Sequence, residues 1–129
     1  MEKAAQEEVD HLVWCESRLK ELNSHTSYLN PIFYGLSFGI GAIAGLLGDK
    51  WSLGFVVETE RQVCDHLEQH MKQIPEADLR SHAILKQMKQ EEMQHGTHAH
   101  TAGAAQLPKS VKRVMSFISK VMTKTTYYL

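Results

Sequence analysis

Two short segments of the chain contain a glutamate and a histidine at the same spacing. Glu8 precedes His11 in "EEVDH", and Glu92 precedes His95 in "EEMQH". Residues three apart in a helix share a face, so each pair would present a carboxylate and an imidazole together. Both groups bind iron and other first-row transition metals. Because the motif is short, its position in the chain decides whether it has a chemical role.

Both pairs fall on helix faces that are otherwise largely apolar. In the helix expected over residues 2–22, one face carries Ala4, Glu8, His11, Cys15, Leu19 and Leu22. In the helix expected over residues 76–104, one face carries Ser81, Leu85, Met88, Glu92, His95 and Ala99. Apolar residues recurring at steps of three or four predict the buried side of a helix. A carboxylate on that side is costly to bury unless it is paired or binds a metal.

A third carboxylate, Glu60, occupies a similar position in the helix expected over residues 49–75, which ends at Pro75. One face of this helix carries Leu53, Val56, Glu60, Val63, Leu67, Met71 and Ile74. The polar face carries Glu58, Asp65 and Lys72. Glu60 is therefore expected to face inward, whereas Glu58 is expected to point outward.

Three helices would thus each direct a carboxylate inward, and two of them would add a histidine. This pattern matches the di-iron carboxylate bundle, in which two helices each give one glutamate and two others each give Glu-x-x-His. The chain supplies the last three of these four contributions. The alternative interpretation is that Glu8 and Glu92 are solvated residues that pair with lysine or histidine.

Two further helices are expected, and neither carries a predicted ligand. Pro31 suits the first turn of a helix that continues to residue 47. Residues 26–48 contain no charged side chain and are long enough to be considered for a membrane span. Because the rest of the chain is soluble in character, we favour a helix within a bundle, or a shallow membrane contact. The last helix is expected over residues 107–124. No useful segment alternates with a period of two, so the chain is predicted to be all-α.

Length and charge narrow the class of protein further. One domain over residues 1–129 is the natural expectation for this length. A formal net charge of −1 does not favour nucleic acid as a partner. After Glu92 the chain has no acidic residue and carries the cations Lys109, Lys112, Arg113, Lys120 and Lys124. Two cysteines without a C-x-x-C motif do not indicate a disulfide framework, so a reducing compartment is expected.

The segments "EEVDHL", "LNPIFYGLSFGIGAIAGLLGDKWSLGFVVETERQV" and "EEMQH" resemble the bacterial demethoxyubiquinone hydroxylases of ubiquinone biosynthesis. The resemblance covers nearly all 129 residues, and "GDKWSLGFVVETE" is its most specific part. It implies a ferritin-like di-iron monooxygenase that uses dioxygen to hydroxylate the ring of a polyprenylated demethoxyubiquinol. It also implies two iron ions, a peripheral position on the cytoplasmic side of the cell membrane, and contact with other ubiquinone-biosynthesis proteins.

The resemblance assigns five residues as metal ligands. Glu8 and His11 match the family's first Glu-x-x-His, Glu60 its single glutamate, and Glu92 and His95 its second Glu-x-x-His. The remaining family ligand is a glutamate on an earlier helix that is absent from this sequence. The bundle is therefore expected to be N-terminally incomplete, so that the chain is a fragment or a shortened product. We expect such a chain to bind iron poorly and to self-associate.

The sequence does not decide the roles of the other histidines, and it allows two other functions. The family has a histidine at the offset of His66, which is either a residue behind the ligands or a partly buried helix histidine. His98 and His100 are expected to be exposed to solvent. Two alternative functions are a non-catalytic iron-binding protein with the same bundle and a membrane-associated structural fragment. The helix over residues 31–47 and the basic last helix are the candidates for membrane contact.

Overall fold

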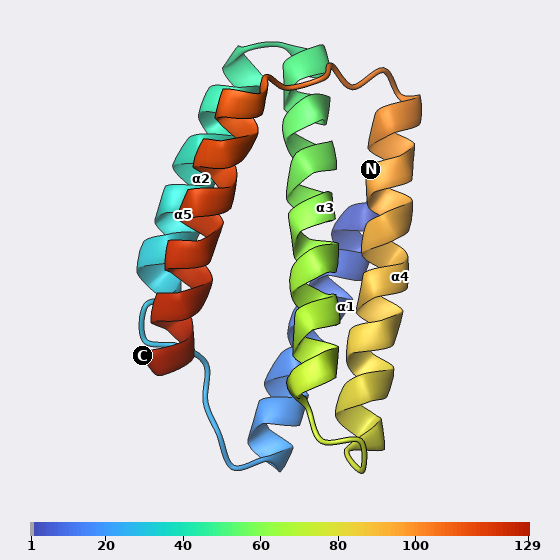
Figure 1. The fold of residues 1–129 in the computed structure, drawn as a ribbon, viewed down its shortest axis with the longest axis vertical. Coiled ribbons are helices and arrows are strands. Elements are labelled where there is room, and N and C mark those ends of the chain that lie inside the picture. The colour runs from blue at the N-terminus through green and yellow to red at the C-terminus, as the bar shows by residue number, and fades with distance from the viewer. Residues whose placement is uncertain (1) are drawn as a thin grey trace.

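The computed structural model describes residues 2–129, which form five helices and no strand (Figure 1). In chain order these are α1 (Glu2–Glu21), α2 (Asn30–Leu46), α3 (Asp49–Gln73), α4 (Leu79–Thr101) and α5 (Lys109–Tyr128). The all-α prediction is confirmed. The antiparallel pair of α3 and α4 has the most extensive packing, α1 lies against α4, and α2 and α5 each contact α3.

Several helix ends differ from the sequence-based expectation by one to four residues, and two of these differences have a local cause. Helix α4 begins at Leu79 because the Asp78 side chain accepts a hydrogen bond from the Ser81 amide at 3.1 Å and caps the helix. Helix α5 continues past residue 124 to Tyr128, since no glycine or proline interrupts the terminal residues.

The loop between α4 and α5 passes close to α3 at Gly54. The Ala105 amide donates a hydrogen bond to the Lys50 carbonyl at 2.9 Å. A Cβ atom at Gly54 would collide with the Ala105 carbonyl oxygen and approach the Leu107 side chain. Only glycine allows this approach without a shift of the backbone. The loop thereby covers one side of α3, and its own Leu107 side chain is buried there.

Glu58 lies under this same loop, so the prediction that it points outward is wrong. Only 3% of the residue is exposed. Its carboxylate accepts hydrogen bonds from Arg61 Nη2 at 2.7 Å and from Gln62 Nε2 at 3.0 Å. The bond from Arg61 holds the pKa of Glu58 below its usual value. The periodicity of α3 predicted that the face carrying Glu58 is exposed to solvent. A helical repeat gives no information about a loop from another part of the chain that covers this face.

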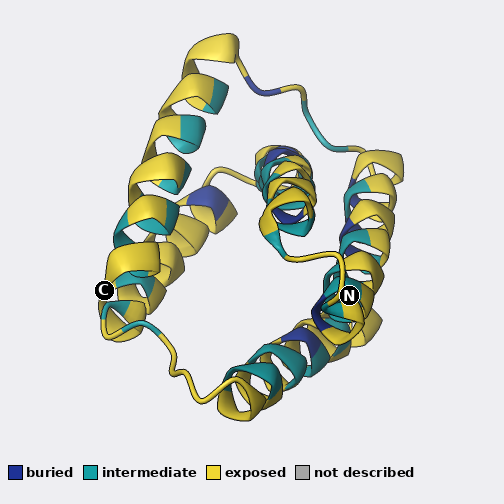
Figure 2. Cartoon of the chain, turned by 60° about the horizontal axis from the view of Figure 1, so that its bottom comes forward, coloured by how far each residue is buried: buried dark blue, intermediate teal, exposed yellow. Residues whose placement is uncertain are grey.

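Charged and polar groups contribute more than large apolar groups to the interior. The buried apolar residues are Ala44, Leu67, Ala99 and Leu107. The buried polar residues are His11, Glu58, Ser81, Glu92 and His95. Figure 2 shows the buried positions chiefly on the sides of α1, α3 and α4 that face one another, while α2 and α5 are largely exposed. The bundle is thus organised around a polar centre.

Helices α2 and α5 present many large apolar side chains to solvent. On α2 these include Ile32, Leu36, Phe38, Ile43 and Leu46, and on α5 they include Val114, Phe117, Ile118 and Val121. No helix within residues 2–129 has the length and apolar composition needed to cross a membrane.

Candidate metal centre

Helices α1, α3 and α4 direct the five predicted ligands into one region of the bundle. One side-chain ligand atom from each of Glu8, Glu60, Glu92 and His95 lies within 4.8 Å of the others. His11 borders the same group, with its Nδ1 atom 3.1 Å from Glu92 Oε1. The inward stripes read from the sequence therefore meet in space, and metal binding by these residues stays a prediction.

The two Glu-x-x-His glutamates lie between the two histidines. Glu92 places Oε1 3.1 Å from His11 Nδ1 and Oε2 3.2 Å from His95 Nδ1. Glu8 is arranged in the same way, with Oε2 3.9 Å from His11 Nδ1 and Oε1 3.5 Å from His95 Nδ1. Each carboxylate thus has one oxygen beside each imidazole. This arrangement suits carboxylates that bridge two metal ions.

Glu60 makes the centre asymmetric. Its Oε1 atom lies 4.0 Å from His95 Nδ1, and its side chain is 14% exposed. Within residues 2–129, His11 Nδ1 has no carboxylate within 4.0 Å besides Glu8 and Glu92. The half of the centre at His95 therefore has one more carboxylate than the half at His11.

The donor atoms fit a transition-metal ion. His11 Nδ1 is buried and has no hydrogen-bond partner among residues 2–129, since its contact with Glu92 lacks the geometry of a hydrogen bond. A buried imidazole nitrogen that faces carboxylates without a partner is well placed to accept a metal ion instead. The combination of carboxylate oxygens and imidazole nitrogens is one that iron binds readily.

Without a cation, burial and like charges act against ionisation of the carboxylates. Burial, followed by the hydrogen bond and charge of Glu92, raises the pKa of Glu60 to about 9. Burial and the charge of Glu92 also raise the pKa of Glu8. Burial lowers the pKa of His95, but its hydrogen bond to Glu7 and the charges of Glu92 and Glu8 outweigh burial and raise it. The metal-free centre therefore retains protons that a bound cation would displace.

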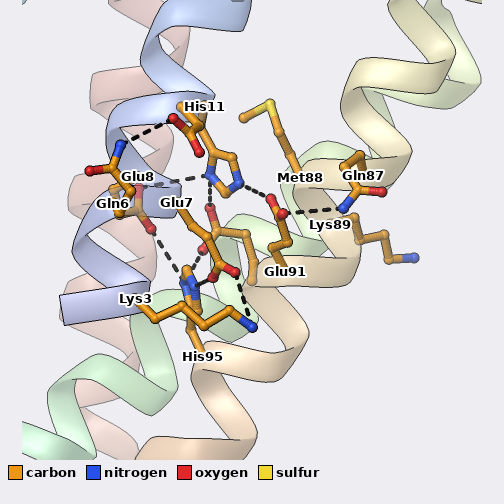
Figure 3. A network of polar contacts seen from close by, with 12 residues as sticks. Lys3, Gln6, Glu7, Glu8, His11, Gln87, Met88, Lys89, Glu91 and His95 are labelled. Atoms are coloured by element: carbon orange, nitrogen blue, oxygen red, sulfur yellow. Dashed lines mark hydrogen bonds and ion pairs between the residues drawn. The ribbon is translucent and has the colours of Figure 1, made fainter. Parts of the chain in front are cut away.

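Sequence reasoning missed two carboxylates that contact the histidines from outside the centre. Glu91 Oε2 lies 2.5 Å from His11 Nε2, and Glu7 Oε2 lies 2.6 Å from His95 Nε2 (Figure 3). Glu7 and Glu91 directly precede the two ligand glutamates, about 100° around the helix from the inward stripe. Each motif begins with two consecutive glutamates, and this repetition could have indicated a second carboxylate beside each predicted ligand.

The remaining histidines lie apart from this network. His66 Nε2 is 2.9 Å from His70 Nε2, and within residues 2–129 no hydrogen bond or ion pair joins His66 to the five predicted ligands. Burial, with a smaller effect of His70, lowers the pKa of His66. His98 and His100 are exposed, as expected.

Several curated proteins match this chain along nearly its whole length. Residues 1–126 match the protein family described as "Ubiquinone biosynthesis protein COQ7". A 3-demethoxyubiquinol 3-hydroxylase of Acinetobacter baumannii is 62% identical over 129 residues, which are 100% of this chain and 61% of that protein. The protein of the same name from Stutzerimonas stutzeri is 61% identical over 127 residues, covering 98% of this chain and 59% of its own length. This chain thus spans about three fifths of the length of the relatives it matches. No solved structure matches it.

Proposed function

The chain belongs to the COQ7 family of ubiquinone biosynthesis proteins, and we propose that it forms the di-iron centre of a 3-demethoxyubiquinol 3-hydroxylase. In such a reaction one oxygen atom of dioxygen enters a ring C–H bond as a hydroxyl group. The other oxygen atom leaves as water, with two electrons and two protons from a donor. The convergence of two Glu-x-x-His pairs and Glu60 carries the proposal.

Each residue of the centre has a proposed role. Glu8, Glu60, Glu92, His11 and His95 would hold the iron, with Glu60 beside His95, and with Glu8 and Glu92 between the two histidines. Two iron ions held in this way supply redox chemistry that no side chain of the centre provides. The protein itself holds the ligands in orientation and limits the access of water at Glu92 and both histidines, which are buried, whereas the Glu8 side chain is 53% exposed.

An apolar groove beside the centre suits the substrate ring. The groove has a volume of about 410 Å³ and lies between α1, α3 and α4. Its lining includes Cys15 and Met88, each one helical turn from a predicted ligand, as well as Leu67 and Ile84. The walls are mostly apolar, with Arg18, His66, His70 and Ser81 as the polar lining residues, and such walls favour a hydrophobic quinol over water.

The exposed faces of α2 and α5 are the proposed contact with the membrane surface on the cytoplasmic side. Both helices present large apolar side chains, and α5 adds five cations without an acidic residue. A basic, apolar helix face binds to a surface of anionic lipid.

The test compares Glu60→Ala with Glu68→Ala, both on α3, in a version of the protein extended to the length of its relatives. Glu68 is the control because it is an exposed residue that pairs with Lys72 and Lys89, whereas Glu58 on the same helix is buried. Hydroxylation of a demethoxyubiquinol should fall at least about 100-fold in Glu60→Ala and stay within twofold in Glu68→Ala. Equal activities in the two variants, both folded by circular dichroism, would remove Glu60 from the centre. Iron binding without hydroxylation would favour the non-catalytic alternative.

A further inference from the structure

We propose that Glu7 and Glu91 are positioning residues, each of which holds the histidine of the opposite helix in the form that binds metal. Glu7 on α1 acts on His95 of α4, and Glu91 on α4 acts on His11 of α1. The proposal rests on the metal centre described under Proposed function.

The shorter contact of each ring indicates which nitrogen carries the proton: His95 Nε2 lies 2.6 Å from Glu7, whereas His95 Nδ1 lies 3.2 Å from Glu92. His11 and His95 both direct Nε2 at the outer carboxylate, at 2.5 and 2.6 Å, and both direct Nδ1 at the ligand glutamates. A carboxylate beside Nε2 accepts a hydrogen bond from it and so keeps the proton there. The lone pair of a neutral ring is then on Nδ1, which faces the centre.

The outer carboxylates are themselves held in place by their own helices. Lys3 Nζ lies 3.6 Å from Glu7 Oε1, and Gln87 Nε2 donates to Glu91 Oε1 at 3.1 Å (Figure 3). Each donor precedes its carboxylate by four residues. The side chains of Glu7 and Glu91 are only 15% and 14% exposed, so water competes weakly for these bonds. Two similar chains of contacts therefore cross the interface between α1 and α4.

The geometry also distinguishes these residues from ligands. Both outer carboxylates contact the Nε2 edge of the ring, whereas Glu8 and Glu92 contact the Nδ1 edge. An ion bound at Nδ1 would have the imidazole between itself and the outer carboxylate. Glu7 and Glu91 therefore act through the histidines.

The first test measures the ring-proton positions of the metal-free chain by ¹⁵N nuclear magnetic resonance, at a pH where the imidazoles are neutral. His95 should carry its proton on Nε2 in the unmodified chain. Glu7→Leu should remove this preference, whereas Glu7→Gln should keep part of it because the amide oxygen still accepts a hydrogen bond. Glu16→Gln, an exposed substitution on the same helix, is the control and should change nothing. An unchanged ring in folded Glu7→Leu would overturn the proposal.

The second test is a titration with Co²⁺, followed by its absorption spectrum. Loss of an outer partner of a metal-bound histidine weakens affinity about 10–100-fold. We expect this loss in Glu7→Leu and Glu91→Leu, a smaller loss in the two glutamine variants, and none in Glu16→Gln. Affinities equal to that of the unmodified chain in folded leucine variants would overturn the proposal.

Two further outcomes, misfolding of the leucine variants and absence of Co²⁺ binding, can be distinguished from those above. If the leucine variants do not fold, the ring-proton positions and Co²⁺ affinities of the glutamine variants decide. If the unmodified chain binds no Co²⁺, the ring-proton positions decide alone. Absence of quinol hydroxylation would refute the proposed enzyme and leave both measurements valid, so the two failures are distinguishable.

Discussion

Glu60 connects the stability of the bundle to pH. Its pKa is about 9 in the folded chain, against an ordinary value of 4.5. Between these values the folded chain keeps a proton that the unfolded chain releases, so the free energy of unfolding falls as pH rises. The raised pKa of His95 acts in the same direction, because its stabilising charge is lost as pH rises.

We therefore expect the metal-free chain to melt at a lower temperature near pH 8.5 than near pH 5.5, a window set by the shifted groups. Glu60→Gln, which cannot ionise, should reduce this dependence, and a saturating divalent cation should do the same. Thermal melts followed by circular dichroism provide the measurement. A melting temperature that rises over this interval would contradict the assignment of a buried, protonated Glu60.

At the scale of the helices, Gly54 determines how closely the α4–α5 loop approaches α3. Gly54→Ala places a methyl group against the Ala105 carbonyl oxygen. We expect it to lower the free energy of unfolding by about 1–3 kcal/mol, as crowding in packed regions does. Gly39→Ala on α2 is the matched control, because a Cβ there meets open space.

In the control position, alanine should be neutral or stabilising by up to about 1 kcal/mol, owing to its higher helix propensity. Urea denaturation of the three proteins measures both effects. If Gly54→Ala were as stable as Gly39→Ala, the loop would not be held against α3 as described.

Helix periodicity predicted the inward stripes well but not what lies against the other faces. It placed Glu8, Glu60 and Glu92 on stripes that do meet, although the Glu8 side chain is 53% exposed at the edge of the centre. It failed for Glu58, since a loop more than 40 residues later in the chain covers that residue. It also missed Glu7 and Glu91: the doubled glutamates mark their positions, but their partners belong to another helix, which helix periodicity does not identify.

For the whole molecule, the unequal halves of the centre predict unequal metal binding. The half at His95 has Glu60 in addition to Glu8 and Glu92, which lie near both histidines, and the half at His11 does not. We expect the first equivalent of Co²⁺ to bind this chain roughly tenfold or more tightly than the second, a difference of about 1.4 kcal/mol. Calorimetric titration measures both steps. Two equivalent sites of equal affinity would contradict the described asymmetry.

The exposed faces of α2 and α5 predict association with lipid. Unless lipid or another surface covers these apolar side chains, the chain should self-associate. We expect it to sediment with vesicles containing anionic lipid and to bind neutral vesicles more weakly. Added salt should reduce the difference between them. Replacing Lys120 and Lys124 by glutamine should also reduce it, whereas Lys86→Gln on α4 should not. Equal binding to both vesicle types would argue against a basic contact surface.

The reciprocal contacts between α1 and α4 also set an order of events during folding. They join residues 80 and 88 positions apart, whereas α3 and α4 are connected by a short loop and share the largest packing surface. Contacts between distant residues form late, because closing a long loop costs chain entropy. During synthesis, α1 is made before α4 and remains without this partner until the ribosome has passed His95. Pulsed hydrogen exchange should accordingly show protection of α3 and α4 before α1, so that the centre is completed only as the first helix docks.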